Sequence, residues 1–114
     1  MGTIANTDDF REGGSPAPVS RGGKRLRFFY GKITMSASYA TNGDTLQLPT
    51  APPGTALKAI DVFPSYNGTR FVFWDGSVSA PKLKAFVEGA AVFAEVANTT
   101  DLSADTRHVL AIYE

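Results

Sequence analysis

Residues 32–48 read KITMSASYATNGDTLQL, and this stretch indicates the fold class. Up to Tyr39, apolar and polar side chains alternate, a period of two that is typical of a strand with one buried face. Asn42-Gly43 follows, and this dipeptide favours a tight turn because both residues tolerate positive φ. Residues 45–48 are short and apolar enough for a second strand. The stretch therefore predicts a strand, a turn and a strand.

Strand-like runs recur through the rest of the chain, separated by turns rich in Gly, Pro and Asn. We expect further strands at 57–63, 70–74, 82–87 and 106–113. The last run is apolar on both faces, which suits the interior of a sheet or a contact between subunits. Many short strands with frequent turn signals predict an all-β fold, an antiparallel β-sandwich or β-barrel.

Residues 79–97 are ambiguous between a helix and strands. Ser79 and Pro81 suit the first positions of a helix, and the segment is rich in alanine. Gly89 in the middle, and the alternation that follows it, favour strands. We expect strands here.

Residues 1–24 differ in composition from the rest of the chain. They hold five of the eleven glycines and few large apolar side chains, too few to offset the entropy of ordering the segment. We predict an extended, flexible N-terminal arm over 1–24 and one β domain over 25–114. Partner-binding candidates are the arm's apolar residues, two basic residues at its junction with the domain and the single tryptophan: Ile4, Phe10, Val19, Arg25, Arg27 and Trp74.

The composition excludes several classes of site. The chain of 114 residues has no cysteine, which excludes disulfides and thiolate metal sites. Eleven basic and eleven acidic side chains leave a net charge of zero, so no overall field attracts nucleic acid or an anionic membrane. Neither a secretory signal nor an apolar run of about 20 residues is present, and we expect a soluble protein made in a cytoplasm.

Candidate catalytic residues are few. His108 is the only histidine, and although Asp101, Ser103 and Asp105 are close to it in sequence, no nucleophile-elbow motif accompanies them. Aspartates in turns routinely cap backbone N–H groups. We therefore expect no enzyme, no metal and no cofactor.

The stretch RFVFWDGSVSAPKLKAF, residues 70–86, contains the only tryptophan. Asp75-Gly76 predicts a turn between two strands, with Phe71, Phe73 and Leu83 on one face. Trp74 near the turn is a candidate for either the core or an interface. Exposed aromatics would also suit a sugar-binding platform, and the basic run 21–27 beside aromatics would suit nucleic acid, so both remain alternatives.

Three stretches carry a resemblance to a known class: GKITMSASYATNGDTLQLP, FVFWDGSVSAPKLKAF and AEVANTTDLSADTRHVLAIYE. With the Gly- and Pro-rich N-terminal segment, they make the chain, over roughly residues 30–114, similar to small structural proteins of tailed bacteriophages. The similarity lies in turns and strands, and it includes no catalytic motif. Asn42 stands where relatives carry a glycine, and Tyr113-Glu114 ends the chain where relatives more often end near glycine.

The resemblance implies a virion structural protein, most like a capsid decoration (cement) protein. Such a protein binds the assembled lattice of the major capsid protein on the capsid surface, as a homo-oligomer (a trimer or a dimer) and without a cofactor. An extended arm could lie across neighbouring subunits of the shell, and many copies acting together would raise avidity. A tail, fibre or baseplate component is the alternative within the same class.

Overall fold

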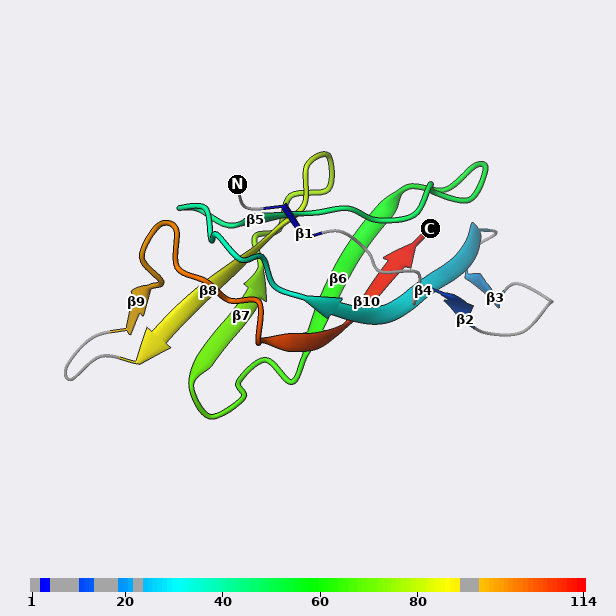
Figure 1. Cartoon of the computed structure of the whole chain (residues 1–114). Helices are drawn as coiled ribbons and strands as arrows, with labels where there is room; N and C mark the ends of the chain where they lie inside the picture. Colours follow the sequence, from blue (N-terminus) through cyan, green and yellow to red (C-terminus); the bar gives the residue numbers. More distant parts are fainter. Residues whose placement is uncertain (1–2, 5–10, 14–18, 22–23, 89–92) are drawn as a thin grey trace.

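Alternation of apolar and polar side chains gives this chain two β-sheets that pack face to face, as the computed structural model shows (Figure 1). The structure describes residues 3–4, 11–13, 19–21, 24–88 and 93–114. Phe10 lies outside these residues. The molecule is elongated, with extents of 48 × 27 × 23 Å. β9 lies at one end, and β2 and β3 lie at the other (Figure 1).

The first sheet, sheet A, has β8 at its centre. Its strands are β1 (Thr3–Ile4), β5 (Asp44–Leu46), β7 (Arg70–Trp74), β8 (Lys82–Glu88) and β9 (Phe93–Glu95). Their order is β1-β5-β8-β7, with β9 also paired to β8. β1 runs parallel to β5, while the other pairs in this sheet are antiparallel.

The second sheet, sheet B, has β4 and β10 at its centre. Its strands are β2 (Arg11–Gly13), β3 (Val19–Arg21), β4 (Lys24–Thr34), β6 (Leu57–Phe63) and β10 (Thr106–Tyr113). The order is β2-β4-β10-β6, with β3 also paired to β4, and all pairs are antiparallel. β10 has a neighbour on each side, which fits its apolar sequence on both faces.

The core fills the space between the sheets. It takes the inward-facing side chains of both sheets and several from the segments that connect them. The buried apolar residues are Ile4, Ile33, Met35, Tyr39, Leu46, Ile60, Val62, Val72, Leu83, Ala85, Val96, Leu102, Val109, Ala111 and Tyr113. The predicted all-β, sandwich-like fold is therefore confirmed.

The turn at Asn42-Gly43 is confirmed by its backbone, because both residues have positive φ, 77° and 117°. The strand predicted before it is too long. β4 ends at Thr34, and the next residues cross from sheet B to sheet A. In this crossing the N–H of Met35 donates to the Asp105 carbonyl (2.9 Å). Of the alternating apolar side chains in the crossing segment, Met35 and Tyr39 are buried, whereas Ala37 is exposed.

The strand interpretation of residues 79–97 is confirmed over the part that the structure describes, where β8 and β9 form. The predicted common face of Phe71, Phe73 and Leu83 is wrong. Leu83 pairs with Trp74, and Phe73 pairs with Lys84, so Leu83 is on the opposite face from the two phenylalanines. The turn between β7 and β8 sets this register, and the sequence alternation alone left it open.

Candidate interaction surfaces

The Trp74-Asp75-Gly76-Ser77 stretch is a turn that is stabilised by hydrogen bonds of its own polar groups. The Asp75 carboxylate accepts from the N–H of Ser77 (2.9 Å) and of Lys82 (3.2 Å), while Gly76 has φ 87°. The indole Nε1 of Trp74 donates to the Ser77 carbonyl (2.9 Å). The indole is half-buried and packs against the core. Asp75 therefore acts as the turn cap that its position predicts.

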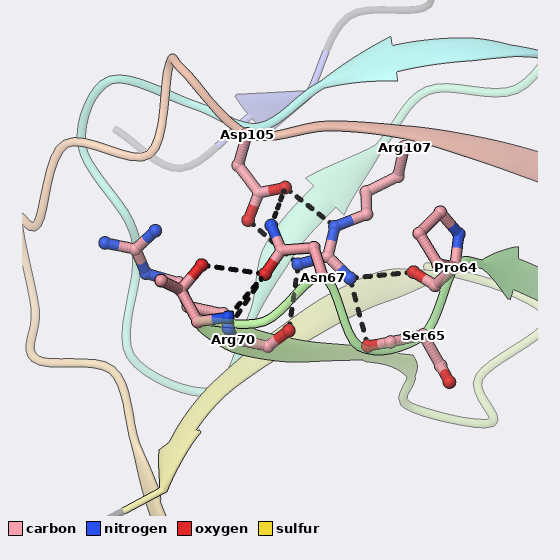
Figure 2. A network of polar contacts seen from close by, with 7 residues as sticks. Pro64, Ser65, Asn67, Arg70, Asp105 and Arg107 are labelled. Atoms are coloured by element: carbon pink, nitrogen blue, oxygen red, sulfur yellow. Dashed lines mark hydrogen bonds and ion pairs between the residues drawn. The ribbon is translucent and has the colours of Figure 1, made fainter.

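A buried arginine holds one end of the sandwich together (Figure 2). Arg107 is fully buried, and its guanidinium donates to both carboxylate oxygens of Asp105 (2.7 and 3.0 Å). It also donates to the main-chain carbonyls of Pro64 (2.8 Å), Ser65 (3.0 Å) and Arg70 (3.1 Å). All five guanidinium N–H groups thus have an acceptor, which is what burying a charge requires.

This cluster joins the two sheets. Arg107 is the second residue of β10 in sheet B. Two of its carbonyl partners lie in the loop that leads to β7, and the third belongs to Arg70, the first residue of β7 in sheet A. The Asn67 side chain donates to Asp105 (3.2 Å) and caps the same loop by accepting from the N–H of Thr69 and Arg70. Sequence reasoning missed Arg107, because a basic residue inside an alternating strand carries no mark of where its partners lie.

The three residues closest to a hydrolytic set do not form one hydrogen-bonded network. The Ser103 hydroxyl donates to Asp101 (2.6 Å), and this bond and the Ser103 N–H lower the pKa of the Asp101 carboxyl. The ring of His108 stacks on Phe63 with centroids 6.0 Å apart. Within the described part of the chain, no hydrogen bond joins His108 to Ser103 or Asp101. Ser103 and Asp101 form a local turn, which is a structural role.

Tyr39 closes a gap in sheet A. β5 and β9 pair with different parts of the same edge of β8, and the buried Tyr39 hydroxyl lies between them. It accepts from the N–H of Ala85 (3.1 Å) and donates to the Glu95 carboxylate (2.6 Å). Burial and the bond to Glu95 raise the pKa of Tyr39 well above its ordinary value.

The candidate partner-binding residues of the arm and of its junction with the domain lie in different parts of the structure. Ile4 is 1% exposed and packs in the core of this same chain, through the pairing of β1 with β5. Val19 and Arg25 lie on β3 and β4, which pair with each other, but their side chains are outside the described part. Arg27 is half-buried on β4 opposite Tyr113. A role for this segment in binding a partner stays a prediction.

The outer face of sheet A carries a continuous group of aromatic rings, here called the aromatic row: Tyr66, Phe71, Phe73 and Phe86. Tyr66 and Phe71 stack with centroids 4.3 Å apart, and Phe71 and Phe73 follow at 5.9 Å. Tyr66 is 44% and Phe73 is 41% exposed. Contiguous exposed apolar side chains of this kind mark interaction surfaces.

The outer face of sheet B is also partly apolar. Tyr30 on β4 and Phe63 on β6 are 47% and 45% exposed. Between them, Leu110 and Ile112 of β10 are half-buried, and Leu110 pairs directly with Tyr30. The two outer faces together give the sandwich two apolar surfaces on opposite sides.

A cleft of about 380 Å³ separates β6 from β7, the last strands of their sheets on this side of the molecule. Its lining consists of Ile60, Asp61, Val62, Ser65, Val72, Phe73 and Trp74. At one end the cleft is closed, because the Val72 N–H donates to the Ser65 carbonyl (2.9 Å) where the loop returns. Asp61 is the one charged residue among those that line it.

A second groove, of about 310 Å³, lies between β5, the start of β6 and the turn before β8. Its lining is apolar and includes Leu46, Leu48, Leu57, Val78 and Tyr113. Within the described residues, no group of three or more His, Asp or Glu side chains is placed to hold a metal ion. The same residues include no helix long and apolar enough to cross a bilayer.

Comparison with known proteins adds no relative to this picture. No protein-family model, no curated protein and no solved structure matches the chain. The surfaces above are therefore interpreted from their own chemistry.

Proposed function

We propose that this chain is a structural protein of a tailed-phage virion, a capsid decoration protein that binds the assembled shell of the major capsid protein. The observation that carries the proposal is the aromatic row, an exposed group of rings on the outer face of a sheet. Tyr66 and Phe73 each leave more than two-fifths of their surface in water. Covering such rings is a large source of binding free energy at protein interfaces.

The chemistry of the described polar groups supports a mechanical role. The Asp75, Asp105 and Arg107 side chains make hydrogen bonds to other groups of this same chain. A protein that binds only the assembled shell stabilises it by mass action, without chemistry of its own. Many copies on a repeating lattice also need only modest affinity each.

The geometry of the aromatic row favours a protein partner over a sugar. A sugar ring stacks on the open face of an aromatic ring, but Tyr66 and Phe71 already cover one face of each other at 4.3 Å. The outer face of sheet B, with Tyr30 and Phe63, is the surface we assign to self-association into a dimer or a trimer.

Co-sedimentation with purified capsids and, separately, with purified tails tests the proposal. We expect saturable binding to capsids and none to tails. The double variant Tyr66→Ser/Phe73→Ser should lose most of this binding, whereas Val78→Ser, which removes an equally exposed apolar side chain elsewhere, should keep it. Binding to tails alone would contradict the capsid assignment and identify the chain as a tail component. Equal binding by both variants would contradict the role of the aromatic row.

A further inference from the structure

The edge of β7 that faces the cleft has backbone groups in position to pair with another strand. In a strand, the N–H and C=O of one residue point to the same side, and this side alternates along the chain. The Val72 N–H points away from β8, because it donates to Ser65. Trp74, two residues on, therefore also directs its N–H and C=O away from β8.

The neighbouring bonds confirm this alternation. The N–H of Asp75 donates to the Lys82 carbonyl (3.0 Å), so Asp75 faces β8 and Trp74 does not. On β8 itself, Ala85 donates to Tyr39 on its far side, as expected for the residue opposite Val72. Within the described residues, the Trp74 main-chain groups have no backbone partner. An unpaired edge of this kind is a template for strand addition.

The opposite edges of both sheets are already covered by this chain. β1 pairs with β5 at one edge of sheet A, and β2 with β4 at one edge of sheet B. β6 and β7 are the terminal strands left on the other side, and the cleft lies between them. The described strands of the N-terminal segment pair at the opposite edges, so these strands do not fill the cleft.

We propose that the cleft between β6 and β7 binds an extended segment of a partner protein, added as a strand along β7 at Val72–Trp74. Its main chain would pair with the N–H and C=O of Trp74. Apolar side chains at alternate positions would contact Ile60, Val62 and the Trp74 indole. One lysine or arginine would lie near Asp61, the only charged residue of the lining. This proposal does not depend on the proposed capsid function.

Selection from a displayed library of linear ten-residue peptides, followed by NMR of the full chain with a selected synthetic peptide, tests the proposal. We expect selected peptides to alternate apolar residues and to carry a basic residue. Binding should slow hydrogen exchange of the Trp74 backbone amide and shift the emission of this single tryptophan to shorter wavelength. Asp61→Lys should raise the Kd for the peptide several-fold. Lys58→Asp, a charge reversal on the same strand outside the cleft, should leave the Kd unchanged.

Three results would overturn the proposal. One is a library that yields no binding peptide. Another is a bound peptide that leaves exchange at Trp74 unchanged, which places binding elsewhere. The third is protection of the Trp74 amide that grows with protein concentration in the absence of peptide, because the edge would then be covered by a second copy of this chain. Exchange is measured on the unsubstituted protein, so the test does not require any variant to fold.

Discussion

Replacing Arg107 with methionine should destabilise the domain more than any other single change in the loop that it holds. The side chain is fully buried, and it supplies donors to both oxygens of Asp105 and to three main-chain carbonyls. Methionine fills a similar volume but donates nothing. It leaves the Asp105 carboxylate buried, with the Asn67 amide as its remaining side-chain donor.

The expected loss is about 3–5 kcal/mol, the cost of removing one partner from a buried ion pair. At roughly 4 °C per kcal/mol for a domain of this size, the melting temperature should fall by about 12–20 °C. Urea unfolding followed by Trp74 fluorescence measures the free energy, and thermal unfolding measures the temperature.

The double variant Asp105→Asn/Arg107→Met is the matched control. It removes the buried charge along with its partner, so it should be more stable than Arg107→Met alone. A loss below about 1 kcal/mol for Arg107→Met would refute the reasoning, because that is the size expected of an exposed pair. A double variant less stable than the single one would contradict the claim that the unpaired charge of Asp105 causes the loss.

Three further predictions concern sheet A and the tyrosines. Tyr39→Phe removes the hydroxyl that bridges β8 and β9 and should cost about 1–3 kcal/mol in urea unfolding, since the buried Ala85 N–H loses its acceptor and the Glu95 carboxylate keeps only the Asn42 N–H as a donor. Burial and its bond to Glu95 raise the pKa of Tyr39, and burial raises that of Tyr113. The contribution of these two neutral phenols to the free energy of unfolding should therefore be fully present below pH ~10, and it should fall as the pH rises above the pKa of tyrosine in the unfolded chain. Absorbance titration should show these two phenols ionising last. Gly43→Ala, at φ 117° with a new Cβ 3.1 Å from a β8 carbonyl, should cost about 1–3 kcal/mol, more than Gly54→Ala, where nothing lies within 4 Å.

Local patterns in the sequence predicted much of the fold. The Asn42-Gly43 dipeptide predicted its turn correctly, because positive φ is a property of the residues themselves. The alternation at 106–113 likewise predicted a strand, and the structure has one at Thr106–Tyr113. These features depend on neighbours in the chain, so sequence reasoning can reach them.

Features that depend on residues far apart in the chain could not be predicted from the sequence. The end of β4 at Thr34 is set by bonds to residues about 70 positions further on, which no local pattern reveals. The carbonyl partners of Arg107 lie 37 to 43 residues away. The aromatic row requires the register of β7 on β8 and the return of Tyr66 onto Phe71, and both follow from turn geometry. Among the residues that line the cleft, Trp74 is the one that the sequence predicted as a partner-binding candidate.

Electron cryo-microscopy of tailed-phage capsids incubated with this chain tests the proposed capsid function most directly. We expect density for the two-sheet sandwich on the outer surface of the shell, with Tyr66 and Phe73 of the aromatic row covered by the major capsid protein. Density for the sandwich in the tail, or on the shell with the aromatic row facing solvent, would contradict it.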